Sequence, residues 1–155
     1  MRMLARRDYP RAALAQRLVK RGADPVEVTR TLDELERLGY LSDTRFAQML
    51  VAQKSARFGK RAIAHAMRAQ RIEPSAARTA LDALAGTDEL PLARAVWARR
   101  FRTAPKDERE RARHIRFLIA RGYGVAVALA VVGRSCGGAA DRHTEDEADP
   151  DIDGG

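Results

Sequence analysis

The sequence predicts an all-α protein, built from tandem three-helix repeats that form an elongated, curved array. Three observations support this fold class. Alanine, leucine and arginine dominate the 155 residues, and these side chains lose little conformational freedom in a helix. Apolar residues recur at helical spacing, and no long alternating pattern of the strand type is present. Related phrases also return about every 50 residues, which is typical of a helical repeat.

The repetition becomes visible when the chain is aligned with itself. A shift of 49 residues places residues 13–35 on residues 62–84, and a shift of 100 matches the segment around Gly22 with that around Gly122. A repeat region over 1–134 is therefore expected, with approximate repeats at 1–38, 43–85 and 90–133. The matched pairs are Ala13/Ala62, Ala15/Ala64, Pro25/Pro74, Leu32/Leu81, Asp33/Asp82, Leu35/Leu84, Leu18/Leu118, Arg21/Arg121 and Gly22/Gly122.

Proline, glycine and capping residues indicate where the helices begin and end. Pro25 fits the first turn of a helix with Asp24 as its N-cap, and Ser42 can cap the helix that begins at Asp43. Gly22 and Gly39 suit helix ends that need a left-handed residue. Each repeat should thus hold three helices, except the first, which holds two and a short stub. The predicted helices are 10–21, 24–38, 43–57, 60–71, 74–85, 90–102, 107–121 and 124–133.

Apolar stripes on these helices should face the core. Stripes at helical spacing are predicted in three places. They comprise Val28, Leu32 and Leu35; Phe46, Ala47, Leu50 and Val51; and Leu92, Ala93, Val96 and Trp97.

The net charge of +8 divides unevenly along the chain. Residues 1–134 hold 28 Lys/Arg and 14 Asp/Glu, whereas residues 135–155 hold one Arg and seven acids. The tail 135–155 cannot bury enough apolar surface to order itself, so it should be disordered. The basic body indicates an anionic partner, either nucleic acid or an acidic protein surface. The alternative is a helical protein that simply prefers arginine.

The sequence offers no convincing catalytic or cofactor site. His65, His114 and His143 are scattered, and Cys136 is the single cysteine, so no metal-ligand spacing exists. The segment "RFGKRA" at 57–62 lacks the spacing of a phosphate-binding P-loop. We therefore expect no enzyme, no metal and no cofactor. The longest apolar run, 125–133, is too short to span a membrane, and a cytoplasmic monomer is expected.

Basic residues cluster at the predicted helix ends, about once per repeat. Complementation of the helix dipole accounts for some of them, but in "RFGKR" the charges straddle a break between two helices. An extended array would align such clusters for contact with a partner or with DNA phosphates. The candidate partner- or DNA-binding residues are Lys20, Arg21, Arg57, Lys60, Arg61, Arg99, Arg100, Arg102 and Arg121.

Four segments of the chain carry a resemblance to a known family. They are "LARRDYPRAALAQRLVKRG" at 4–22, "LDELERLGYLSDTRFAQMLV" at 32–51, "GKRAIAHAMRAQRI" at 59–72 and "RFLIARGYGVAVALAVV" at 116–132. The most specific motif is Gly39-Tyr40-Leu41 followed by Asp43, Arg45, Phe46 and Ala47, and the next is Arg121-Gly122-Tyr123. These segments resemble the RecX family, which regulates the bacterial RecA recombinase.

The resemblance implies a non-enzymatic regulator with a role in recombination, DNA repair and the SOS response. Family members bind the RecA filament on single-stranded DNA and limit its recombinase, ATPase and coprotease activities. The expected partners are the RecA filament and single- or double-stranded DNA. Two alternatives stay open: a module that binds nucleic acid without sequence preference, and a helical scaffold for another acidic partner.

Overall fold

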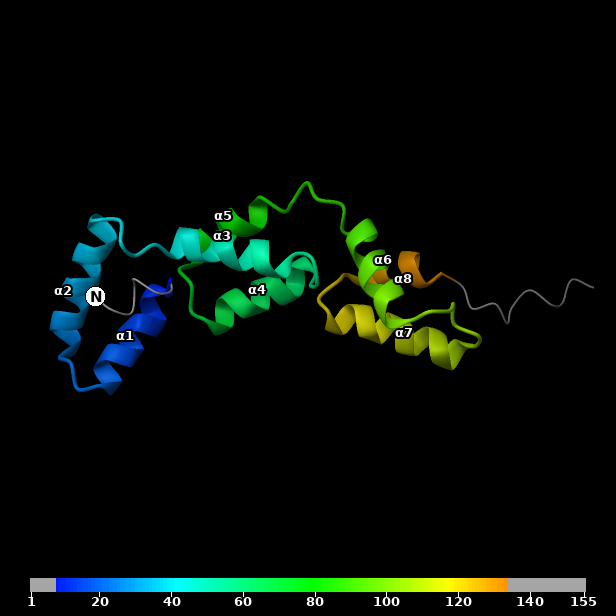
Figure 1. The fold of residues 1–155 in the computed structure, drawn as a ribbon, viewed down its shortest axis with the longest axis horizontal. Helices are drawn as coiled ribbons and strands as arrows, with labels where there is room; N and C mark the ends of the chain where they lie inside the picture. The colour runs from blue at the N-terminus through cyan, green and yellow to red at the C-terminus, as the bar shows by residue number, and fades with distance from the viewer. Residues whose placement is uncertain (1–7, 134–155) are drawn as a thin grey trace, which may run out of the picture.

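The computed structural model describes residues 8–133, and this part of the chain folds into eight helices with no strand (Figure 1). The all-α fold class is confirmed, and each predicted helix is present, ending one to three residues earlier than predicted, with α6 starting one residue earlier, at Glu89. The predictions for residues 1–7 and 134–155, including the acidic tail, lie outside the described residues. The helices are α1 (Arg11–Lys20), α2 (Pro25–Arg37), α3 (Asp43–Lys54), α4 (Lys60–Ala69), α5 (Pro74–Asp82), α6 (Glu89–Arg100), α7 (Glu108–Ala120) and α8 (Val125–Val132).

The helices form three successive groups along the long axis of the molecule (Figure 1). Helix α1 packs on α2, helices α3, α4 and α5 pack on one another, and α8 packs on both α6 and α7. Each group has its own core, so the apolar stripes predicted from the sequence face inward within a group. The buried apolar residues are Leu14, Val28, Leu32 and Leu41 in the first group. They are Phe46, Ala47, Leu50, Ile63, Met67, Ile72, Ala76 and Ala80 in the second, and Ala93, Val96, Leu118, Tyr123, Ala128, Val131 and Val132 in the third.

Helix starts follow the predicted caps. The Asp24 carboxylate accepts a hydrogen bond from the Glu27 N–H (3.1 Å), and the Ser42 hydroxyl accepts one from the Arg45 N–H (3.2 Å). Helix α3 ends at Lys54, three residues earlier than predicted, because residues 55–58 form a turn that leads into α4. This early end places Arg57 in a connecting turn rather than on a helix.

One C-terminal motif recurs at the ends of α1, α2, α4 and α7. The residue after the C-cap has positive φ in all four: Gly22 (94°), Gly39 (77°), Arg71 (54°) and Gly122 (93°). In each case the next N–H reaches back five residues, as in Ile72 N–H to Met67 O (3.1 Å), which is the Schellman pattern. Arg71 is the one non-glycine residue with positive φ among residues 8–133.

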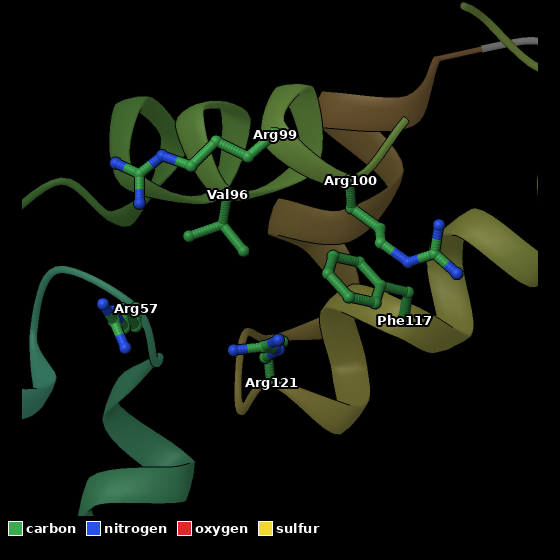
Figure 2. Close-up of a pocket in the computed structure, with 6 residues that line it drawn as sticks. All are labelled: Arg57, Val96, Arg99, Arg100, Phe117 and Arg121. Carbon is green, nitrogen blue, oxygen red and sulfur yellow. The ribbon is translucent and has the colours of Figure 1, made fainter. Parts of the chain in front are cut away.

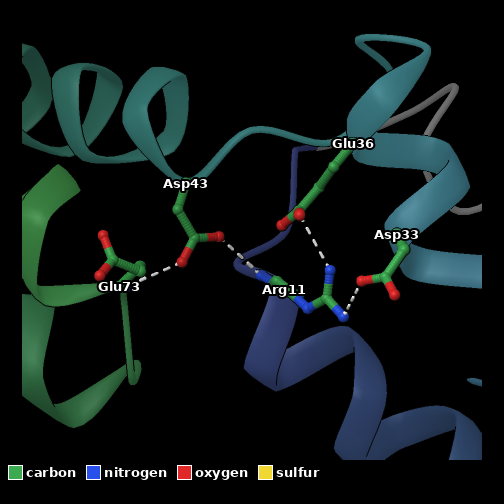
Figure 3. A network of polar contacts seen from close by, with 5 residues as sticks. All are labelled: Arg11, Asp33, Glu36, Asp43 and Glu73. Atoms are coloured by element: carbon green, nitrogen blue, oxygen red, sulfur yellow. Dashed lines mark hydrogen bonds and ion pairs between the residues drawn. The ribbon is translucent and has the colours of Figure 1, made fainter. Parts of the chain in front are cut away.

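Asp43 ties the first group of helices to the second (Figure 3). One carboxylate oxygen accepts the Arg11 N–H at the start of α1, and the other accepts the Glu73 N–H just before α5, both at 2.8 Å. The Arg11 guanidinium in turn pairs with Asp33 (2.6 Å) and Glu36 (2.9 Å) on α2. A single carboxylate thus satisfies two helix-start donors from two different groups.

Glu89 performs the equivalent role between the second and third groups. Its carboxylate accepts the Lys60 N–H at the start of α4 (2.7 Å), and the Lys60 ammonium donates to the Thr87 carbonyl (3.2 Å). The Gly59 N–H also donates to the Arg121 carbonyl (2.9 Å). A Cβ on Gly59 would collide with the Gly122 backbone, and one on Gly122 would collide with Ala62. The two glycines therefore permit backbone contact between the groups.

His114 occupies a core position. The sequence placed it only in a basic helix, but it is 5% exposed and aligns with Leu14 (3%) and Ile63 (1%) in the other groups. Its ring stacks on Phe101 (3.7 Å between centroids), and its Nδ1 accepts from the Trp97 indole N–H (3.3 Å). Burial lowers the pKa of His114, Glu110 raises it, and Arg113 and Arg100 lower it.

Replacing Arg71 with glycine should stabilise the protein. A left-handed conformation costs a non-glycine residue about 1 kcal/mol, and glycine adopts it without that strain. We expect Arg71→Gly to raise the urea midpoint by an amount equivalent to about 1 kcal/mol. Gly22→Ala, where a methyl group meets open space, should lower stability by a similar amount, and Gly122→Ala should lower it further because of the collision with Ala62. Equal effects of the two alanine variants would contradict this account.

His114 should make stability depend on pH. Because the pKa of His114 in the folded state lies below its unfolded value of 6.5, the unfolded state binds more protons at acid pH. Stability is therefore fully present above pH 6.5 and declines as the pH falls through the lower, folded-state pKa. We expect His114→Leu to reduce the loss of urea-unfolding free energy between pH 7.5 and pH 5, relative to the native chain. A loss of unfolding free energy in His114→Leu as large as that of the native chain over this pH range would contradict this account.

Candidate functional site

Four of the candidate basic residues converge on one pocket between the second and third helix groups (Figure 2). Arg99 and Arg100 project from α6, Arg121 is the C-cap of α7, and Arg57 lies in the turn after α3. The cavity has a volume of about 320 Å³, and Val96 and Phe117 also line it. Figure 2 shows Arg57, Arg99 and Arg121 around Val96, whereas Arg100 lies beyond Phe117 in this view.

Backbone contacts hold these arginines in place. The hydrogen bond from Gly59 N–H to the Arg121 carbonyl fixes the turn that carries Arg57 against the end of α7. On α6, Ala93 and Val96 face the core, which leaves Arg99 and Arg100 on the exposed side at the end of the helix. The pocket is therefore formed by the junction itself.

Aromatic rings support two of the guanidinium groups. The Arg121 guanidinium lies 5.2 Å from the Phe58 ring centroid and 5.4 Å from that of Phe117, so it sits between the two helix groups. The Arg100 guanidinium lies 5.2 Å from the Phe101 ring. Contacts of this kind contribute about 0.5–1 kcal/mol at exposed sites and restrict the side chain.

The pocket carries positive charge without a matching acid. Ion pairs within residues 8–133 involve Arg11, Arg37 and Arg111, and none involves an arginine of the pocket. The lining contains no carboxylate. Four like charges held close together repel one another, and an anion that enters the pocket relieves this repulsion. The arrangement can bind an anion, and it contains no nucleophile or general base.

The other predicted residues do not join the pocket. Lys20 and Arg21 are exposed at the end of α1, in the first helix group, and Arg102 is exposed after α6. Lys60 holds the junction through Thr87, and Arg61 follows it with an exposed side chain. Contact of any of the nine residues with a partner stays a prediction.

The apolar residues near the pocket belong to the cores of the helix groups. Val96 lies in an apolar stripe that the sequence assigns to the core, and it is part of a core cluster, against which Phe117 packs. Phe58, beside the pocket, packs against the core of the second group. The sequence shows that Phe58 follows Arg57, but it does not show that the Phe58 ring lies next to Arg121 across the junction.

Residues 8–133 contain neither a metal-binding cluster nor a membrane-spanning helix. No group of three or more His, Cys, Asp or Glu residues in that part could hold a metal ion. None of the helices from α1 to α8 is long and apolar enough to cross a membrane.

Comparison with known proteins links the chain to one family. Residues 42–81 match the second three-helix domain of RecX, and residues 87–132 match the third. The chain is 38% identical to "Regulatory protein RecX" of Leptothrix cholodnii, covering 85% of this chain and 83% of that one. It is 37% identical to the protein of the same name in Chromobacterium violaceum, covering 93% and 91%.

A solved structure shares the fold. The crystal structure of RecX from Lactobacillus salivarius superposes with a TM-score of 0.71 at 13% identity, covering 84% of this chain and 88% of that one. The similarity at this level of identity concerns the arrangement of the helices.

Proposed function

The chain belongs to the RecX family, and we propose that it binds the RecA filament on DNA and restrains its recombinase, ATPase and coprotease activities. In this role it acts by binding and catalyses no reaction. The expected setting is the cytoplasm, where the filament assembles during recombination, DNA repair and the SOS response. The observation that supports this proposal is that the chain matches two successive RecX domains and, along most of its length, relatives named as regulatory proteins.

The arginine pocket supports a binding role. A DNA filament is a long polyanion, and an elongated protein can follow it while presenting charge at a defined place. Arg57, Arg99 and Arg121 lie where two helix groups meet, so a bound partner would contact both groups at once. This arrangement supports a regulator that lies along its partner, and we propose that it acts as a monomer.

The same pocket supports a second candidate function, a module that binds nucleic acid without RecA. Four arginines and no lining acid would bind phosphates electrostatically. Binding to DNA alone, with affinity that falls steeply in salt, would favour this module. Binding that requires RecA would favour the regulator.

Removing charge from the pocket should weaken the regulator. The native chain should slow ATP hydrolysis by RecA on single-stranded DNA at substoichiometric amounts. For Arg57→Gln/Arg99→Gln/Arg121→Gln, we expect half-maximal inhibition to need at least about tenfold more protein, because charge-assisted hydrogen bonds contribute about 1.5–3 kcal/mol each. The measurement is the rate of phosphate release against protein concentration.

The matched control removes the same charge elsewhere. Arg30→Gln/Arg68→Gln/Arg78→Gln changes three exposed arginines, none of which lines the pocket. It should inhibit RecA nearly as well as the native chain. Equal losses in both triple variants would show that net charge, rather than the pocket, determines inhibition. No inhibition by the native chain at equimolar RecA would refute the proposed function.

A further inference from the structure

The junction between the first and second helix groups contains a second pocket at the same place in the fold. This first-junction pocket has a volume of about 800 Å³. Its lining includes Asp8, Leu50, Gln53, Lys54 and Gln70, and the other lining residues are Tyr9, Pro10, Ala13, Phe46 and Met49. We call the arginine pocket of Figure 2 the second-junction pocket.

Helix registers show that the two pockets correspond residue by residue. Helices α3 and α6 both have 12 residues, and the buried pair Ala47 and Leu50 of α3 matches Ala93 and Val96 of α6. Gln53 and Lys54 therefore correspond to Arg99 and Arg100.

The remaining walls of the pockets align in the same way. Gln70 and Arg121 are the C-caps of α4 and α7, which end in the same motif. Asp8 and Arg57 each stand two residues before the N-cap of the helix that starts at the junction, where the caps are Pro10 and Gly59.

The corresponding positions differ in charge. Where the first-junction pocket has Asp8, Gln53 and Gln70, the second has Arg57, Arg99 and Arg121. Lys54 and Arg100 keep the fourth position basic in both. The first-junction pocket lining thus has one acid and one base, whereas the second has four bases. The same backbone arrangement supports a neutral pocket at one junction and a cationic pocket at the other.

We propose that the second-junction pocket is a phosphate-binding site and that the first-junction pocket is its neutral counterpart. Arg57, Arg99 and Arg121 come from three different segments and surround Val96, so their donors approach one small space from several directions (Figure 2). A phosphate group offers tetrahedrally arranged oxygens to such donors, whereas a planar carboxylate is satisfied by one or two guanidinium groups.

The proposal rests on the proposed function, because it names the group that the pocket takes from that partner. A phosphate in a nucleic-acid backbone would contact the molecule at the second junction only. The chain would then be anchored by its second and third helix groups, and the first group would be placed by the hydrogen bonds of Asp43 at the first junction rather than by its own phosphate contact.

The test transplants the residues of one pocket into the other. Inorganic pyrophosphate is titrated into the purified full chain by isothermal calorimetry at low salt. We expect one site. Arg99→Gln and Arg121→Gln, which copy Gln53 and Gln70, should each weaken binding by about tenfold or more. In the reverse direction, the Asp8→Arg/Gln53→Arg/Gln70→Arg variant should bind two pyrophosphates per chain.

Controls separate the pocket from folding and from net charge. The Arg121 guanidinium packs on two aromatic rings, so thermal unfolding is used to check that the Arg121→Gln variant is folded. The cation–π contacts at the pocket involve Arg100 and Arg121 and not Arg99, so Arg99→Gln removes no such contact. Arg68→Gln removes an exposed charge outside the pocket and should bind pyrophosphate as the native chain does. Unchanged binding in both Arg99→Gln and Arg121→Gln would overturn the proposal, as would equal loss in Arg68→Gln.

Two further titrations identify the source of the phosphate. A 12-nucleotide single strand that competes with pyrophosphate, and that loses affinity in Arg99→Gln, would indicate the nucleic-acid backbone. Pyrophosphate binding without such competition would indicate a free phosphate ligand at the same site. Poly-glutamate that binds as tightly as pyrophosphate, with the same response to Arg99→Gln, would overturn the phosphate assignment. RecA inhibition by a chain that does not bind pyrophosphate would refute this site and leave the proposed function intact.

Discussion

The structure depends on a helix cap that is supplied by the following repeat. Helices α1 and α4 begin after Pro10 and Gly59, which have no side chain that could accept the first N–H groups. The acceptor is the carboxylate of Asp43 for α1 and of Glu89 for α4, and each is the first residue of the next repeat's first helix. An unsatisfied N–H in a partly buried site costs about 1–3 kcal/mol. Each junction is therefore stabilised by a hydrogen bond that completes a helix in the repeat before it.

This shared cap explains why the basic residues converge. Once Glu89 and the close approach of Gly59 to Gly122 fix α4 against α7, the turn that carries Arg57 must lie beside Arg121. Helix α6 starts at Glu89 itself, so its far end, with Arg99 and Arg100, closes the same space. Residues separated by more than 60 positions meet without any ion pair between them among the described residues. Backbone contacts thus overcome the repulsion that the arginines exert on one another.

The sequence predicts helices and caps well because these are local. Asp24 and Ser42 cap helices as expected, and Gly22 adopts the expected left-handed conformation, because each of these roles depends only on residues a few positions away in the sequence. The junctions were not predicted, because Asp43 and Glu89 differ in type and an identity-based alignment cannot pair them. The same limit applies to the pocket: charge clusters were visible in the sequence, but which of them meet depends on contacts between repeats. His114 was also missed, since a histidine at a core position looks polar until its alignment with Leu14 and Ile63 is known.

Equivalent positions of the repeats keep the same backbone hydrogen bonds while their side chains differ. The left-handed position after the C-cap is occupied by Gly22, Gly39, Arg71 or Gly122, and the residue before the helix at a junction is Pro10 or Gly59, and the hydrogen bonds are retained in each case. The three positions that differ in charge between the two pockets do not belong to the buried core of any helix group, so their side chains can differ while the core stays the same. Three positions then suffice to change a neutral pocket into a cationic one without altering how the helices pack. A protein with this construction can change what it binds at one junction while the other junction, and the length of the array, stay the same.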